Sequence, residues 1–228
     1  MTGGEDGYDE LRSGFTAAVS HELRTPLARL LALLESAELP GAEVGELVAQ
    51  ARHEVEQMRE LVDDVLFLGE LETGAGVVSL GQTAALPVLE EVAASFAETA
   101  ARAGVEIRVS GARGVELPLR QRMLRVVVEN LVENAIRYAG GGSRLRLALT
   151  VVGGEAVLSA ADDGAGVPAE DLPRLFERFF RSDRARSTRG TGLGLAIVKH
   201  VVTAAGGRVE ARGGAGRGLE VRCVFPTR

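Results

Sequence analysis

The sequence predicts a multi-domain chain: an all-α helical hairpin that forms a dimeric four-helix bundle, followed by an α+β domain. Two patterns indicate this division. Up to about residue 72, apolar residues recur in steps of three and four, which is the spacing of amphipathic helices. After a glycine-containing break at 69–76, short apolar runs alternate with helical segments and turn residues. That second pattern is typical of a mixed sheet with helices on one face.

The first half contains two helical segments. Residues 9–38 read as one helix, which Leu39-Pro40-Gly41 ends. A heptad seam follows, formed by Val44, Val48, Ala51, Val55, Met58, Val62 and Val65. A heptad seam needs a packing partner along its length and a hairpin alone buries little, so we expect two chains to form a four-helix bundle. Packing of the hairpin on the rest of its own chain is the alternative.

The breaks in the pattern set the expected boundaries. We expect a flexible N-terminal end at 1–8, the hairpin domain at 9–72, a hinge linker at 73–76 and the second domain at 77–228. Within the second domain the patterns predict helices at 87–103, 119–139 and 192–205, and strands at 77–80, 105–109, 114–117, 144–152, 156–161, 208–211 and 219–225.

Composition argues against several classes of function. A net charge of −6 over 228 residues disfavours a general nucleic-acid or anionic-membrane surface. No apolar run approaches the roughly 20 residues that span a bilayer, and no signal peptide is recognisable. The single cysteine, Cys223, suits a reducing cytosol because it cannot form an internal disulfide. The histidines and the cysteine lack zinc-ligand spacing.

His21 is the candidate nucleophile, within the run FTAAVSHELRTPL at 15–27. It lies off the apolar face of its helix, with Glu22 beside it and Thr25 one turn further on. An exposed imidazole next to a carboxylate can act as a nucleophile. A lone helical histidine is more often an ordinary surface residue, as we expect for His53.

Two motifs of the second domain offer polar ligands. Asn130 and Asn134 share one edge of a helix, which Arg137 and Tyr138 extend, and their amide oxygens suit Mg²⁺ beside a phosphate chain. The run DDGAG places Asp162 at the end of a strand, where its partly buried carboxylate could accept the exocyclic amine of an adenine. Gly164 and Gly166 follow in this run and permit a tight turn and close ligand approach. Solvated asparagines and an ordinary turn are the alternative interpretations.

Two further motifs could meet phosphates. The run LFERFFR ends at Arg181, and Arg184, Arg186 and Arg189 follow in a loop long enough to be a lid. The alternative is a solvated charge run. The run GTGLGLA then leads directly into a helix whose N-terminus favours phosphate. No Gly-Lys-Ser/Thr follows, so it is not a P-loop, and it does not sit in a dinucleotide-binding βαβ unit.

Together these motifs resemble the sensor histidine kinases of two-component systems, over nearly the whole chain after residue 8. The resemblance rests on five boxes in family order: FTAAVSHELRTPL resembles the phosphoacceptor box, NLVENAIRYA the N box, DDGAGVP the first glycine box, LFERFFR the phenylalanine box and GTGLGLAIVK the second glycine box. It implies a dimerisation and phosphotransfer hairpin followed by a Bergerat-type, α/β-sandwich ATP-binding domain.

The resemblance also implies a role for each site residue. His21 would be phosphorylated by ATP, Glu22 would take the other imidazole proton, and Thr25 would orient water or the regulator in a phosphatase reaction. Asn134 would bind Mg²⁺ with support from Asn130. The nucleotide would contact Arg137, Tyr138, Asp162, Gly164, Gly166, Arg181, Gly190, Thr191, Gly192, Leu193 and Gly194.

The function implied is ATP-dependent autophosphorylation of His21 and phosphoryl transfer to an aspartate of a response-regulator receiver domain. The implied state is a cytoplasmic homodimer without nucleic-acid or membrane contact in this segment, consistent with the cytoplasmic portion of a bacterial membrane sensor. Two alternatives stay open. One is an ATPase of the gyrase and chaperone type, which the resemblance says carries Glu where this chain has Asn130. The other is a phosphatase-only or non-enzymatic dimer.

Overall fold

The computed structural model describes residues 5–72, 81–182 and 190–226. Packing divides the chain into two compact units, Met1–Phe67 and Leu68–Arg228, and each is described by itself. The expected hinge at 73–76 and strand at 77–80 lie outside the described residues, as do Arg184, Arg186 and Arg189.

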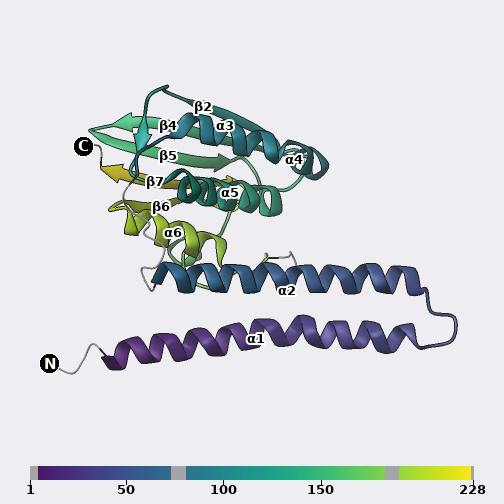
Figure 1. Cartoon of the computed structure of the whole chain (residues 1–228). Helices are drawn as coiled ribbons and strands as arrows, with labels where there is room; N and C mark the ends of the chain where they lie inside the picture. The colour runs from purple at the N-terminus through teal and green to yellow at the C-terminus, as the bar shows by residue number, and fades with distance from the viewer. Residues whose placement is uncertain (1–4, 73–80, 183–189, 227–228) are drawn as a thin grey trace. The chain divides into compact units, whose positions relative to one another are not determined.

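The first unit is built from two long helices, as predicted (Figure 1). Helix α1 spans Glu5–Ala37, so it begins four residues before the expected start, and it continues through Pro26. Helix α2 spans Val44–Glu72 and extends into the second unit. An ion pair of 3.8 Å between Arg29 Nη1 and Glu54 Oε1 links the two helices. In the part of the chain that the structure describes, no helix combines the length and apolarity that a membrane span requires.

Large apolar side chains of the hairpin remain exposed in the single chain. Leu27, Leu31 and Leu34 of α1 are 51%, 58% and 55% exposed. The α2 seam shows the same property, with half-exposed valines at 44, 48 and 55. Removing such surface from water contributes about 25 cal/mol per Å². The expected apolar faces therefore exist, but one hairpin does not bury them.

Besides the end of α2, the described residues of the second unit form four α-helices and one 3₁₀ turn: α3 Ala85–Ser95, α4 Ala97–Ala103, α5 Gln121–Tyr138, η1 Leu172–Arg174 and α6 Gly194–Ala204. The predicted helix at 87–103 is divided at Phe96. Just before the break, the Ser95 hydroxyl donates to the Val92 carbonyl at 2.8 Å, and such local bonds compete with the helical pattern. The predicted helices at 119–139 and 192–205 are confirmed as α5 and α6.

The main sheet is mixed, with strand order β2-β4-β5-β7-β6. Its strands are β2 Glu106–Gly111, β4 Arg144–Val152, β5 Glu155–Asp162, β6 Arg208–Gly213 and β7 Leu219–Pro226. Among the described strands, only β2 and β4 pair in parallel, and β4–β5 and β6–β7 form antiparallel hairpins. A separate pair joins β1 Thr83–Ala84 to β3 Glu116–Leu117. The sequence did not predict β1.

Helices α3, α5 and α6 cover one face of the main sheet, as expected (Figure 1). The alternation along β4 explains why the helices cover this face. Its leucines at 145, 147 and 149 are buried toward the helices, whereas Arg144 and Arg146 are exposed. Cys223 of β7 lies in this core, and burial raises the pKa of its thiol to about 12. It is therefore a protonated core residue at neutral pH.

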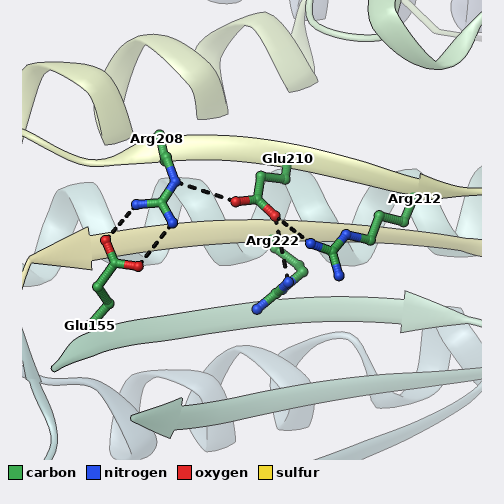
Figure 2. Close-up of polar contacts among 5 residues, drawn as sticks. All are labelled: Glu155, Arg208, Glu210, Arg212 and Arg222. Atoms are coloured by element: carbon green, nitrogen blue, oxygen red, sulfur yellow. Dashed lines mark hydrogen bonds and ion pairs between the residues drawn. The ribbon is translucent and has the colours of Figure 1, made fainter. Parts of the chain in front are cut away.

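The other face of the sheet carries a ladder of ion pairs near the β6 edge (Figure 2). Arg208 of β6 reaches over β7 and donates two hydrogen bonds, of 2.5 and 2.8 Å, to the Glu155 carboxylate on β5. Glu210 accepts from Arg208, Arg212 and Arg222 at 3.0–3.5 Å. Charged side chains on an edge strand also discourage pairing with another sheet.

We expect Glu155→Gln to lower the melting temperature at low ionic strength, with the difference vanishing near 1 M salt, where the screening length is about 3 Å. Hydrogen bonds from Arg208 lower the pKa of the Glu155 carboxyl. The stabilisation is therefore present above the ordinary carboxyl pKa and is lost as pH falls through the lowered one. Thermal melts in series of salt concentration and pH measure both dependences.

Glu220→Gln is the matched control, because Glu220 lies on the same face and forms no ion pair with another described residue. Equal losses of melting temperature in Glu155→Gln and Glu220→Gln would contradict a stabilising role of the ion pair between Glu155 and Arg208.

Candidate functional site

His21 is highly accessible on α1. Its side chain is 76% exposed, and its Nδ1 lies 3.9 Å from Glu22 Oε1. Thr25 is exposed one turn further on. Pro26 follows within the helix and has no N–H to offer the carbonyl of Glu22. The first unit thus presents an open imidazole with a carboxylate beside one of its nitrogens.

Asp162 ends β5 on the helix-covered side of the sheet and is half-buried, as expected. Its Oδ1 accepts a hydrogen bond of 2.9 Å from the Gly164 N–H. Burial raises the pKa of this carboxyl, while the backbone N–H groups of Gly164, Leu219 and Asp162 oppose the rise. The arrangement leaves a fixed, partly desolvated acceptor that suits the amine of a purine ring.

The turn after Asp162 packs directly on the end of α5. The Ala165 N–H donates to the Ala139 carbonyl at 3.0 Å. A Cβ on Gly164 would lie 2.5 Å from the Ala139 Cα, so only glycine allows this approach. The contact brings the DDGAG turn to the helix that carries the asparagines.

Helix α5 meets the start of α6 through Asn130. The Asn130 amide donates to the Val126 carbonyl at 2.9 Å. Its Oδ1 faces Gly194, where an added Cβ would lie only 2.6 Å from that oxygen. Asn134, one turn along α5, is half-buried. Amide oxygens at this position are suitable ligands for Mg²⁺.

The loop before α6 meets the last turn of α5. A Cβ on Gly190 would lie 2.5 Å from Tyr138 Oη and 3.0 Å from Arg137 Nη1. Residues about fifty positions apart are therefore neighbours. The Thr191 hydroxyl accepts from the Leu193 N–H at 3.2 Å, and the buried Leu193 fixes the start of α6.

The phenylalanine-rich segment is attached to the same loop. Among the described residues, Phe179 is the one non-glycine with positive φ, 61°. Its N–H donates to the Gly192 carbonyl at 3.0 Å, and a Cβ on Gly192 would lie 2.8 Å from the Phe179 carbonyl carbon. Arg181 follows two residues later and is half-buried. The segment is thus bonded to the loop that leads into α6.

These contacts join the turn after Asp162, the loop before α6 and the phenylalanine-rich segment to α5 or to one another, whereas His21, Glu22 and Thr25 belong to the first unit. The sequence reasoning missed Leu219 and the glycine-rich residues 213–218 before it. Their signal was the density of glycine in GGAGRG. Where the structure describes the chain, no group of three or more His, Cys, Asp and Glu side chains is placed to hold a metal. A magnesium ion would thus depend on asparagine oxygens and on phosphates, which matches its usual coordination.

Two sequence families match this chain. Residues 119–228 match the family described as histidine kinase-, DNA gyrase B-, and HSP90-like ATPase. That family alone does not separate kinases from other ATPases. Residues 11–74 match the His Kinase A (phospho-acceptor) domain, which contains His21. The chain belongs to the sensor histidine kinases. The two domains form the catalytic core of this family.

Similar proteins agree with the assignment. The histidine kinase core is 32% identical over 221 residues to the sensor-like histidine kinase SenX3 of Mycobacterium bovis, covering 94% of this chain and 54% of SenX3. Its fold resembles the Acinetobacter baumannii histidine kinase AdeS, with a TM-score of 0.72, 25% identity and coverage of 91% and 98%. Full-length ShkA in complex with AMPPNP gives a TM-score of 0.67 at 30% identity, covering 92% of this chain and 45% of ShkA. The chain spans about half the length of the curated relatives it matches.

Proposed function

We propose that the chain phosphorylates itself on His21 with ATP and then passes the phosphoryl group to an aspartate of a response-regulator receiver domain. One observation carries the proposal: a single chain joins an exposed histidine–carboxylate pair to a domain of the ATPase family. Phosphatase activity toward the regulator, with Thr25 orienting water, is part of the same proposal.

The arrangement of His21 and Glu22 supports a different role for each nitrogen of the imidazole ring. Nδ1 is the nitrogen near Glu22, so its proton can pass to that carboxylate, and Nε2 is left to attack. The attack forms a bond from Nε2 to the γ-phosphorus and breaks the bond from that phosphorus to the oxygen shared with ADP. Removing the Nδ1 proton keeps positive charge from accumulating on the ring.

The second unit would hold the nucleotide. Asp162 would accept the adenine amine, and Gly164 and Gly166 would let the ring approach. Asn130 and Asn134 would hold Mg²⁺, which neutralises phosphate charge when bound. Phosphate and ribose contacts would come from Arg137, Tyr138, Arg181, Gly190, Thr191, Gly192, Leu193 and Gly194. The AMPPNP complex of the similar ShkA supports nucleotide binding at this domain.

The proposal also covers the homodimer and the division of the chain into domains. The exposed apolar residues of α1 and α2 support a homodimer in which two hairpins bury these faces. Residues 9–72 would form the dimerisation and phosphotransfer domain, residues 73–76 the hinge, and residues 77–228 the ATP-binding domain. We place the reaction in the cytoplasm because it consumes ATP.

Transfer of label from γ-labelled ATP tests the proposal. Wild type should acquire an acid-labile, base-stable label, and His21→Ala should acquire none because the acceptor nitrogen is gone. His53→Ala is the matched control. His53 is a helical histidine whose Nε2 lies 2.8 Å from Gln57 Nε2, and this variant should label like wild type. Turnover of ATP without label on any variant would favour a plain ATPase. Neither label nor turnover would favour a non-enzymatic dimer.

A further inference from the structure

The loop between β6 and β7, residues 214–218, is bonded to the turn that follows Asp162. This C-terminal glycine loop donates from the Gly216 N–H to the Ala165 carbonyl at 2.7 Å. The Gly218 N–H donates to the Gly164 carbonyl at 3.1 Å. Two backbone bonds therefore join segments that lie about fifty residues apart in the sequence.

The approach leaves no room for a side chain. Gly218 is buried with a φ of 72°, and an added Cβ would collide with the Asp162 carbonyl oxygen and lie 3.0 Å from the Asp163 Cα. From the opposite side, a Cβ on Gly166 would lie 2.8 Å from the Gly218 carbonyl oxygen. The two backbones are thus packed against each other at van der Waals distance.

The loop also leads directly into a residue whose backbone N–H acts on the Asp162 carboxylate. Leu219 directly follows it, and the Leu219 N–H helps to lower the pKa of the Asp162 carboxyl against the effect of burial. The loop lies on one side of the turn and Ala139 of α5 lies on the other. The turn that follows Asp162 is consequently fixed by two other parts of the chain, α5 and the C-terminal hairpin, and the Gly164 N–H of that turn donates to the Asp162 carboxylate.

We propose that the C-terminal glycine loop positions Asp162 for adenine recognition, and that Gly218 is the residue on which this positioning depends. The proposal rests on the proposed function, because it assigns the loop to the same nucleotide site. The loop need not touch the nucleotide. It acts by holding the turn at 163–166 and by aiming the Leu219 N–H at the carboxylate.

Gly218→Ala tests the proposal. The new Cβ forces the Asp162 backbone away, so we expect ADP affinity to fall about tenfold or more, since a hydrogen bond to a charged group contributes on that order. The preference for ADP over GDP should fall as well, because Asp162 selects the purine amine. Partial unfolding alone would lower the apparent affinities for ADP and GDP by the same factor, so it would leave their ratio unchanged. Calorimetric titrations with ADP and GDP measure the ratio.

Gly206→Ala is the matched control. Gly206 has a φ of 79° in the turn between α6 and β6, and an added Cβ there meets nothing within 4 Å. It therefore reproduces the cost of a left-handed alanine without the collision, and it should keep the wild-type ADP to GDP ratio. A Gly218→Ala protein that binds ADP with wild-type affinity and selectivity would overturn the inference.

Hydrogen exchange of the wild-type protein keeps the test decisive if Gly218→Ala does not fold. ADP should slow exchange of the Gly216 and Gly218 amides, because their acceptors belong to the turn that the nucleotide fixes. Unchanged exchange at both amides in the presence of bound ADP would contradict the inference. Failure of the proposed function looks different: wild type would not bind ADP, or Asp162→Asn would bind it equally well.

Discussion

Asp162→Asn should weaken adenine-nucleotide binding by about ten- to a hundredfold, because a hydrogen bond to a charged acceptor contributes roughly 1.5–3 kcal/mol. The substitution keeps the size and one acceptor oxygen, so the turn at 163–166 should keep its place. The dimer should stay intact, since the carboxylate lies in the second unit and the apolar rows lie in the first. Calorimetric titration with ADP measures the change, and an unchanged affinity would contradict the placement of adenine at Asp162.

The same variant should melt at a higher temperature than wild type when no nucleotide is bound. Burial raises the pKa of Asp162, so the folded protein holds this proton more tightly than the unfolded chain does. Charging the carboxyl therefore costs stability as pH rises above its ordinary value of 3.8, and the cost is fully present above the raised pKa. The advantage of the variant should disappear at acid pH, where both forms are uncharged. A lower affinity combined with a higher melting temperature would separate a binding role from general damage.

Asn134→Ala should reduce the rate of autophosphorylation by about 10²–10³, the usual loss when one group that stabilises transition-state charge is removed. The amide oxygen is proposed to hold Mg²⁺ next to the phosphates, and Mg²⁺ relies on few protein ligands when phosphates are present. The variant should therefore lose the part of ATP affinity that depends on Mg²⁺ and retain the part measured in chelator.

Titrations of ATP with and without Mg²⁺, beside labelling rates, measure both effects. Arg122→Ala is the control, because Arg122 is exposed in the first turn of the same helix, distant along α5 from Asn134. If Mg²⁺ enhanced ATP binding equally in wild type and Asn134→Ala, the metal role of this residue would be wrong.

Long periodic segments were predictable, and short or backbone-determined features were not. The predicted range 144–152 matches β4 because its leucines alternate over nine residues, and α5 was evident from its apolar stripe. Strand β1 has two residues, too few for any period. The division at Phe96 coincides with a local hydrogen bond of Ser95, which hydrophobic spacing does not report.

The candidate site likewise has features that the sequence could predict and features that it could not. Side chains such as Asp162 and Asn134 carry recognisable chemistry, so the motifs identified them. The contribution of residues 213–218 is made by backbone N–H groups and by the absence of a Cβ. Glycine is common in hairpin turns, so the run GGAGRG does not by itself distinguish a turn from a positioning element. Only the pairing of β7 with β5 brings that loop to Asp162.

Mapping the phosphoryl group within the chain is the most direct test of the account. The chain has three histidines, at 21, 53 and 200, so digestion and mass spectrometry under neutral or alkaline conditions can separate the possible acceptors. After incubation with ATP and Mg²⁺, the account predicts phosphate on the peptide that contains His21 and on no other histidine. Phosphate on His53 or His200 with His21 unmodified would contradict it.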